Sequence, residues 1–383
     1  MKIVSDDSHF EGSPDMWRSY VAREFQDCVP KVVTLDNGGH GWAMPGTDKP
    51  VPMGTNLSFK NGGRNTRRSG VRYDEAGLAG VGDGAQRLRE MDQDGIDAEI
   101  IYPPVGGLRS LYGKLPREGL VAVARGYNDW LSREYTAANP GRLLGVAMIP
   151  PSGAQDAADE LQRVKNMPGI AGAVLQQWPD GQKVPSPNDD VFWAAAERTG
   201  MPLTFHITFG GGPETEVAPE NELNWVPFNT MITRGGANSG YVCTRLITSG
   251  VFDRFPKLRF SVAEAGSSWL LFYREQLDSN YERHRGWANV ELPHLPSWYL
   301  NRHFLFGMQD DLPAIRVRHE IGVDLISWGS DFPHSASNWP RSHDLLARMF
   351  DGVPDDEAQK ILGGNLAQHL GIDLAAVPQA NQH

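Results

Sequence analysis

The chain has 383 residues, of which 40% are hydrophobic and 22% are charged, and its formal net charge is −11 at pH 7. These values suit a globular protein with a large buried core. The acidic balance argues against nucleic-acid partners, which need a basic stripe on the protein. No apolar run approaches the ~18 residues that a membrane-spanning helix needs.

Two further features bear on the cellular compartment. The two cysteines, Cys28 and Cys243, are too far apart in the sequence for a metal or redox motif, and we expect them to be unlinked thiols. Residues Met1–Val4 run straight into polar residues and do not resemble a secretory leader. We therefore expect a cytoplasmic protein that contacts no membrane.

Eight short apolar runs alternate with amphipathic stretches along the chain. They are rich in Val, Ile and Leu, as buried parallel strands are. The predicted strands are Lys2–Val4, Ile96–Tyr102, Leu143–Ile149, Ile170–Gln176, Pro202–Ile207, Leu258–Glu264, His303–Met308 and Leu325–Ser330.

Apolar residues at helical spacing fill most of the gaps between these strands. The predicted helices are Gly84–Asp94, Leu120–Asn139, Ala154–Asn166, Asp189–Thr199, Ser239–Ser249, Ser267–Tyr281 and Leu312–Ile321, with a terminal helix at Pro354–Leu370. Eight strands with a crossover helix after most of them predict an α/β fold, the (β/α)8 TIM barrel. A doubly wound open sheet is the competing layout, but no G-x-G-x-x-G follows the first strand.

Three stretches, at about residues 24–84, 208–238 and 280–301, are too long to be plain connections. We interpret them as insertions in a single domain that spans residues 1–383. On a barrel, insertions after strands 1 and 5 lie over the active-site face and can act as lids, with surface decoration or subunit contacts as the alternative. The third stretch is rich in aromatic residues, which suits a subunit interface. We expect a homodimer or a higher homo-oligomer.

Residue types that bind metals lie at the ends of several predicted strands. Asp7 and His9 follow the first strand and are two positions apart, so both side chains point to one side. His206 lies at the end of the fifth strand, Glu264 at the end of the sixth, and Asp331 follows the eighth. A barrel collects these strand ends into one pocket. Carboxylate oxygen and imidazole nitrogen together suit Zn²⁺ or Mn²⁺, and we predict a single metal site there.

Each of these residues also has a structural interpretation. Asp7 and His9 alone could be a capping aspartate and a packed histidine. His206 alone could be a core histidine, and Asp331 could cap the following helix. Their joint placement at strand ends favours the metal site.

A set of longer motifs runs along nearly the whole chain. They are Asp7-Ser8-His9-Phe10-Glu11, Arg87–Asp97, Tyr127-Asn128-Asp129-Trp130, Asn139-Pro140-Gly141-Arg142-Leu143, Gly200-Met201-Pro202-Leu203, Ala263-Glu264-Ala265-Gly266, Gly329–His334 and Gly363-Gly364-Asn365-Leu366-Ala367. In these motifs the chain resembles the amidohydrolase superfamily, in the branch of aminocarboxymuconate semialdehyde decarboxylase and the hydroxybenzoate decarboxylases.

The resemblance implies the ligands of the metal. The branch ends its first strand in H-x-H or E-x-H, a place that Asp7 and His9 fill here, and its further ligands match His206 and Asp331. It implies one divalent ion, Zn²⁺ or Mn²⁺, and it places Asp331, Glu264 and His206 among the catalytic residues. Two positions depart from the pattern. Asp7 replaces the usual His or Glu, and Glu264 replaces the His with which many of these decarboxylases handle a proton. Glu264 could act as an acid, a base or a further ligand.

Four residues are candidates for binding the substrate. Glu11 could bind the metal or orient its ligands, and His334 could touch the substrate or cap a helix. Arg109 follows a glycine pair after the second strand and could clamp a carboxylate. Trp178 could line an aromatic pocket. The structural alternatives are a salt bridge for Glu11, a solvated arginine and a packed tryptophan.

Three functions follow from these observations. The first is a metal-dependent, non-oxidative decarboxylase of a hydroxylated aromatic or unsaturated carboxylic acid, as the resemblance implies. The second is a hydrolase in which a metal-activated water attacks an amide, a lactone or a vinylogous C–C bond. The third is a barrel that binds a ligand without turnover, which the nearly complete ligand set disfavours.

Overall fold

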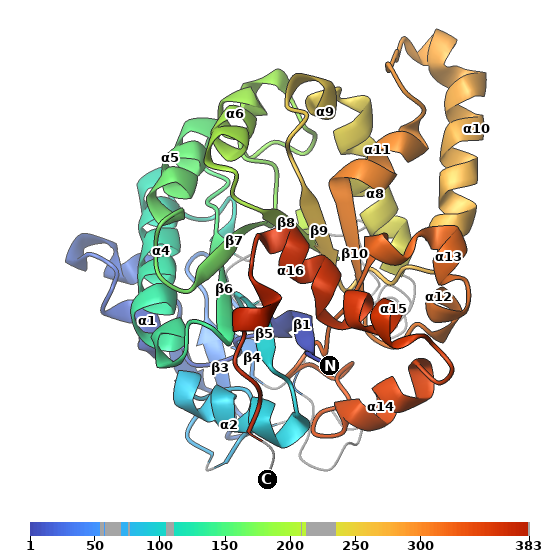
Figure 1. Ribbon diagram of the computed structural model, residues 1–383. Helices are drawn as coiled ribbons and strands as arrows, with labels where there is room; N and C mark the ends of the chain where they lie inside the picture. The colour runs from blue at the N-terminus through green and yellow to red at the C-terminus, as the bar shows by residue number, and fades with distance from the viewer. Residues whose placement is uncertain are drawn as a thin grey trace.

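The computed structural model describes residues 1–53, 57, 70–75, 77–104, 111–207, 209–211 and 235–381. Its main sheet has eight parallel strands that neighbour one another in chain order, with helices packed around them (Figure 1). The strands are β1 (Val4–His9), β5 (Ala98–Tyr102), β6 (Leu143–Met148), β7 (Ile170–Leu175), β8 (Leu203–His206), β9 (Phe260–Ala263), β10 (Phe304–Met308) and β11 (Ile326–Trp328). This arrangement confirms the predicted TIM barrel and rules out the open sheet.

The barrel closes between β1 and the residues just beyond β11. The His9 amide donates to the Phe332 carbonyl at 2.7 Å, and the Asp331 amide donates to the Asp7 carbonyl at 2.8 Å. Ser8 and Phe332 form a parallel bridge at the same place. The closing seam therefore contains three of the four residues that the sequence assigns to the metal site, Asp7, His9 and Asp331.

The first strand is longer than its apolar run indicates. We predicted a strand at Lys2–Val4, whereas β1 continues through polar residues to His9 and is buried along its whole length. The hydroxyl of Ser5 accepts from the Ser330 amide at 2.8 Å and lies 3.2 Å from the hydroxyls of Ser8 and Ser330. Because these polar groups satisfy one another, a polar sequence can form a buried strand.

The helices lie on the outside of the barrel. The predicted helix Gly84–Asp94 has the expected ends, Leu312–Ile321 is divided into two helices, and the other predicted helices are found with shifted ends. The helices are α1 (Asp15–Arg18), α2 (Gly84–Asp94), α4 (Arg117–Trp130), α5 (Ala154–Val164), α6 (Asp190–Thr199), α8 (Gly235–Thr248), α9 (Val251–Arg254), α10 (Leu270–Ala288), α11 (Pro296–His303), α12 (Leu312–Arg316), α13 (Arg318–Ile321), α14 (Ser342–Met349), α15 (Asp355–Gln359) and α16 (Asn365–Leu370). The predicted terminal helix is α15 and α16 joined by a π-helical turn at Lys360–Gly364. None of the helices in the described ranges is long and apolar enough to span a membrane.

The hydrophobic core has two parts, because successive side chains of each strand point alternately into the barrel and out towards the helices. Side chains such as Val4, Ile100 and Val146 fill the barrel interior, where Leu366 of α16 packs against them. The opposite faces of the strands pack against the surrounding helices, for example Phe205 and Phe260 against Trp193 of α6. Because apolar side chains fill the barrel interior, the polar side chains of a site can gather at the carboxyl ends of the strands.

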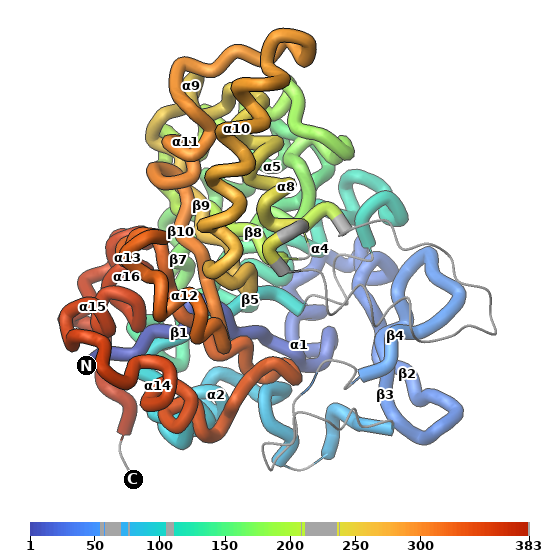
Figure 2. The backbone as a smooth tube through the Cα atoms, turned by 90° about the vertical axis from the view of Figure 1, so that its right-hand side faces the viewer, coloured from blue at the N-terminus to red at the C-terminus, as the bar shows by residue number. Residues whose placement is uncertain are grey.

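The three predicted insertions differ in structure. Part of the first forms a small antiparallel sheet of β2 (Lys31–Thr34), β3 (His40–Ala43) and β4 (Val51–Pro52), which lies on the far side of the barrel from the N-terminus (Figure 2). Most of residues 208–238 lie outside the described ranges. Helices α10 and α11 occupy most of residues 280–301, so this stretch is a helical pair and not an irregular loop.

Candidate metal centre

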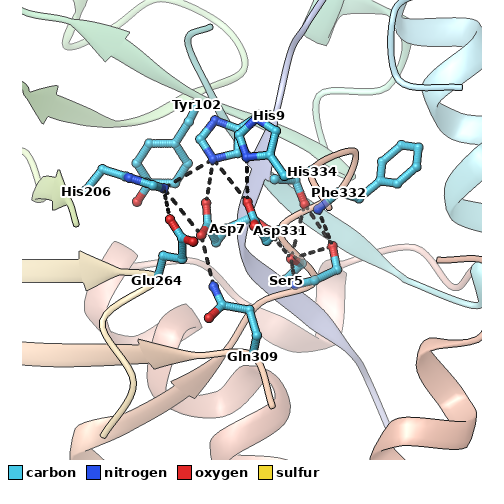
Figure 3. Close-up of polar contacts among 12 residues, drawn as sticks. Ser5, Asp7, His9, Tyr102, His206, Glu264, Gln309, Asp331, Phe332 and His334 are labelled. Carbon is cyan, nitrogen blue, oxygen red and sulfur yellow. Dashed lines mark hydrogen bonds and ion pairs between the residues drawn. The ribbon is translucent and has the colours of Figure 1, made fainter. Parts of the chain in front are cut away.

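Four buried side chains converge at the closing seam of the barrel (Figure 3). His9 Nε2 lies 3.2 Å from Asp7 Oδ1, 3.2 Å from His206 Nε2 and 3.4 Å from Asp331 Oδ1. His206 Nε2 lies 3.6 Å from Asp7 Oδ2. The structure thus brings together all four residues that we predicted as ligands, although they come from β1, β8 and the segment after β11.

The spacing and chemistry of these atoms suit one divalent cation. Ligand atoms about 2.1 Å from a tetrahedrally bound ion are about 3.4 Å apart. The three distances from His9 Nε2 and the one from His206 Nε2 to Asp7 are comparable, at 3.2–3.6 Å, and all four residues offer ligand atoms within 4.8 Å of one another. Asp7 Oδ1 is buried and accepts no hydrogen bond from the described residues. Two carboxylate and two imidazole donors are acceptable to both Zn²⁺ and Mn²⁺. The cluster could therefore hold one such ion.

A β-bulge in β1 aims its acidic side chains. Between Ser5 and Ser8 the pairing with β5 shifts, so that Asp6 and Asp7 together oppose one residue of β5. Asp7 reaches the cluster, whereas Asp6 lies beneath it and accepts a hydrogen bond from Ser327. A Cβ atom on Gly329 would lie 2.4 Å from Asp6 Oδ1, so this niche needs a glycine. Burial raises the pKa of Asp6 to about 8.

Two acidic residues of the site adopt the left-handed backbone region that non-glycine residues rarely occupy. Glu264 has φ 58° directly after β9, and Asp331 has φ 53° shortly after β11. This conformation turns each side chain out of the strand direction and towards the cluster. Glu264 Oε2 then lies 3.5 Å from His206 Nε2, and its side chain is 12% exposed, compared with 1% for Asp331. Such strained conformations concentrate at functional sites.

The electrostatics of the cluster favour an ionised Asp7 and a neutral His9, whereas burial raises the pKa of Asp331. Burial raises the pKa of Asp7, but His206 and His9 outweigh burial, and the pKa of Asp7 is lowered overall. Burial lowers the pKa of His9 to about 4, with help from His334. His206 has a raised pKa because Asp7 and Glu264 outweigh the effect of its burial. A neutral His9 beside an ionised Asp7 is the state that metal coordination requires.

The predicted substrate-binding residues have different surroundings. His334 and Glu11 lie together at the rim of the cluster, where His334 Nε2 is 3.0 Å from Glu11 Oε1. Trp178 is 2% exposed and packs edge-on against Phe209, with the ring centroids 4.8 Å apart, as part of the core. The structural interpretation of Trp178 therefore fits its surroundings better than a pocket lining. Arg109 lies outside the described residues.

Two residues of the site were missed in the sequence. Gln309 follows β10 directly and donates from Nε2 to Asp7 Oδ2 at 3.2 Å. Its position at a strand end was the signal that could have revealed it. Arg87 is 1% exposed on α2, and its guanidinium donates to the carbonyl of His9 and lies over the Phe332 ring at 4.5 Å. No sequence signal separates this arginine from the neighbouring exposed ones.

The comparison with protein families agrees with this geometry. A family model described as Amidohydrolase matches residues 80–372, which include β5 to β11 and the cluster residues His206 and Asp331. The chain belongs to the amidohydrolase family. The predicted ligands on β1, Asp7 and His9, precede the matched range.

Individual relatives of this amidohydrolase are decarboxylases by name. Decarboxylase orsB of Emericella nidulans is 26% identical over 268 residues, which cover 68% of this chain and 76% of the relative. Gamma-resorcylate decarboxylase of a Rhizobium species is 28% identical over 279 residues, covering 66% of this chain and 79% of the relative. The solved structure of 5-carboxyvanillate decarboxylase from Novosphingobium aromaticivorans, complexed with manganese and 4-hydroxy-3-methoxy-5-nitrobenzoic acid, is 18% identical with a TM-score of 0.66, covering 97% of this chain and 96% of that one. This last likeness shows the same fold.

Proposed function

We propose that this amidohydrolase is a metal-dependent, non-oxidative decarboxylase of a hydroxylated aromatic or unsaturated carboxylic acid. The observation that carries the proposal is the cluster of Asp7, His9, His206 and Asp331 at the barrel's closing seam. The named decarboxylases among its relatives support the reaction type. They also favour it over the hydrolase and over a barrel that binds without turnover.

The four cluster residues would hold one Mn²⁺ or Zn²⁺ ion. A bound ion would supply Lewis-acid chemistry, which would stabilise negative charge on a substrate acid in this pocket. The manganese complex of the 5-carboxyvanillate decarboxylase makes Mn²⁺ the first ion to test. The surrounding burial excludes water and strengthens these interactions.

In the reaction that we propose, the bond between the substrate carbon and its carboxylate breaks and CO₂ leaves. The electron pair of that bond stays on the carbon, which takes a proton from a carboxylic acid of the enzyme, and this acid is reprotonated from solvent. Glu264 and Asp331 are the candidate acids. Glu264 is the better placed, because it is more exposed and Asp331 Oδ1 already accepts a hydrogen bond from His334 at 2.9 Å. His206 lies 3.5 Å from Glu264 and would orient it.

The remaining recognition of the substrate falls to residues around the cluster. Glu11 and His334, two of the four candidates, lie at the rim of the cluster beside His9. Arg109 would pair with a second anionic group through its guanidinium. Trp178 would contribute only through the shape of the pocket, because it is packed in the core.

The test is CO₂ release from a panel of hydroxybenzoates and muconate-type acids, with Mn²⁺ and Zn²⁺ supplied separately. We expect turnover by the wild type, none by Asp331→Asn or His206→Ala, and unchanged turnover by the matched surface variant Asp324→Asn. Glu264→Gln should retain about one ion per chain by plasma mass spectrometry while losing turnover. No CO₂ from any acid at saturating metal would refute the proposal, and solvent ¹⁸O in a product would point to the hydrolase.

We also infer a homo-oligomer, most simply a dimer, in the cytoplasm. The support for an interface is a set of exposed aromatic side chains, Phe272 and Trp287 on α10 and Tyr241 on α8. The free thiols Cys28 and Cys243 are compatible with a reducing compartment. A monomeric mass by light scattering at micromolar concentration would contradict the oligomer.

Residues 1–383 are proposed to act as one domain, which a single cooperative unfolding transition would support.

A further inference from the structure

A chain of hydrogen bonds leads outward from one carboxylate of the cluster. His334 Nδ1 donates to Asp331 Oδ1 at 2.9 Å, and His334 Nε2 donates to Glu11 Oε1 at 3.0 Å. The His334 side chain is 11% exposed and that of Glu11 is 19% exposed. Both nitrogens of His334 are therefore committed to protein carboxylates, and neither is left to bind a substrate.

His334 also contacts a second residue of the cluster. Its ring stacks on the ring of His9, with centroids 4.0 Å apart and planes at 25°. One imidazole thus restrains a carboxylate ligand through a hydrogen bond and an imidazole ligand through ring packing. Moving the ring would disturb both.

The backbone holds His334 in this position from two sides. Its amide donates to the Asp331 carbonyl at 2.8 Å, which closes a tight turn that begins at the left-handed Asp331. Leu57, from the first insertion, forms an antiparallel bridge with His334.

The other carboxylate of the cluster has a similar outer partner. Gln309 Nε2 donates to Asp7 Oδ2 at 3.2 Å, on the side of Asp7 that faces away from His334 (Figure 3). Each carboxylate ligand is therefore oriented by one side chain that lies outside the ligand set. Outer partners of this kind typically change metal affinity about 10–100-fold when removed.

We infer that His334 is a positioning residue for the metal centre, that Glu11 orients its ring, and that neither binds the substrate. This inference rests on the proposed metal site and replaces the substrate-binding role that the sequence suggested for both residues. It assigns the first insertion, through Leu57, to the support of the metal centre as well.

The decisive experiment measures metal affinity in the absence of substrate. Mn²⁺ and Zn²⁺ are titrated into chelator-treated full-length protein in competition with a chelating dye. The variants are His334→Ala, His334→Asn, Glu11→Gln and the matched surface control His319→Ala. Asparagine places its amide nitrogen near the position of Nδ1, so His334→Asn retains the donor to Asp331 and loses the bond to Glu11.

We expect His334→Ala to weaken metal binding about 10–100-fold, His334→Asn to recover part of that loss, and Glu11→Gln to have a smaller effect. His319→Ala should bind as the wild type does. At saturating metal, His334→Ala should then lower kcat with little change in KM. If the alanine variant does not fold, His334→Asn and Glu11→Gln provide the same comparison.

Three results would overturn the inference. The first is a metal affinity of the His334 and Glu11 variants within twofold of the wild type. The second is a raised KM with unchanged metal affinity, which would return both residues to substrate binding. The third is no metal binding by the wild type, which would remove the proposed centre itself. A wild type that binds metal but releases no CO₂ refutes the decarboxylase alone, and the affinity series then still decides the role of His334.

Discussion

Arg87 allows a quantitative test of how the barrel seam is held together. Its buried guanidinium donates to the Tyr135 hydroxyl at 3.1 Å and to the carbonyl of His9, and it lies 3.6 Å from the carboxylate of Glu99. It also lies over the ring of Phe332, so it contacts both sides of the seam. We predict that Arg87→Met, which keeps the apolar stem and removes the charge, destabilises the protein strongly.

The expected loss of unfolding free energy in Arg87→Met follows from the contact partners of Arg87, which stay buried when the guanidinium is removed. Glu99 Oε2 accepts no hydrogen bond from the described residues, and burial raises the pKa of Glu99 to about 7 even though Arg87 opposes this rise. Lost hydrogen bonds to a charged donor cost about 3 kcal/mol together. The Glu99 carboxylate would then be buried without a counter-charge, which brings the total cost of Arg87→Met to about 5 kcal/mol.

The cost of losing Arg87 must also depend on pH. The pKa of Glu99 is raised on folding from its ordinary 4.5 to about 7, so the native state binds more protons and its stability falls as pH rises through that window. Without Arg87 the pKa of Glu99 in the folded protein is higher still, so the variant continues to lose stability at pH values where the wild type no longer does. We therefore expect the cost of Arg87→Met to be about 3 kcal/mol near pH 6 and about 5 kcal/mol near pH 8.5.

The assay is urea unfolding followed by circular dichroism at both pH values, for Arg87→Met, Glu99→Gln and the double variant. Glu99→Gln should remove the pH dependence and recover about 2 kcal/mol in the double variant. The exposed control Arg133→Met should stay within about 0.5 kcal/mol of the wild type. A cost below about 1 kcal/mol at both pH values, or no recovery in the double variant, would refute the reasoning.

Three further predictions concern other parts of the molecule. Burial raises the pKa of Asp94 from its ordinary 3.8 to about 6, so the native state binds more protons and stability falls as pH rises through that window. The wild type should lose up to about 3 kcal/mol of unfolding free energy between about pH 4 and 7, and Asp94→Asn should not show this loss in thermal unfolding. An equal loss in the variant would exclude Asp94 as its source. Chelator treatment should lower the Tm of the metal-loaded wild type, because the ion binds only the folded state, and should leave Asp7→Asn unaffected in calorimetry. An equal shift in both proteins would mean that the chelator acts elsewhere. Gly84→Ala should cost about 1–3 kcal/mol in urea unfolding, since its Cβ would lie 2.1 Å from the backbone oxygen of Tyr135. The open helical position Gly286→Ala, with nothing within 4 Å, should instead gain a fraction of a kcal/mol, and equal effects at both sites would contradict the steric explanation.

Much of the centre could be predicted because a parallel barrel has simple geometry. Each strand brings its carboxyl end to one face, so residues far apart in sequence meet if they end strands. Asp7, His9, His206 and Asp331 all satisfy that condition, and the structure brings them together. Gln309 satisfies it as well and was overlooked only because an amide is a poor metal ligand.

The sequence by itself determined the barrel, through eight apolar runs that alternate with amphipathic stretches, and the residue types that collect at its face. Only the tertiary structure decided the extent of β1, the bulge that separates Asp6 from Asp7, and the use of both His334 nitrogens. The physical reason is that hydrophobic periodicity reports burial of apolar groups alone. A buried polar group is stable only through partners that fold next to it, and those partners lie up to 325 residues away along the chain.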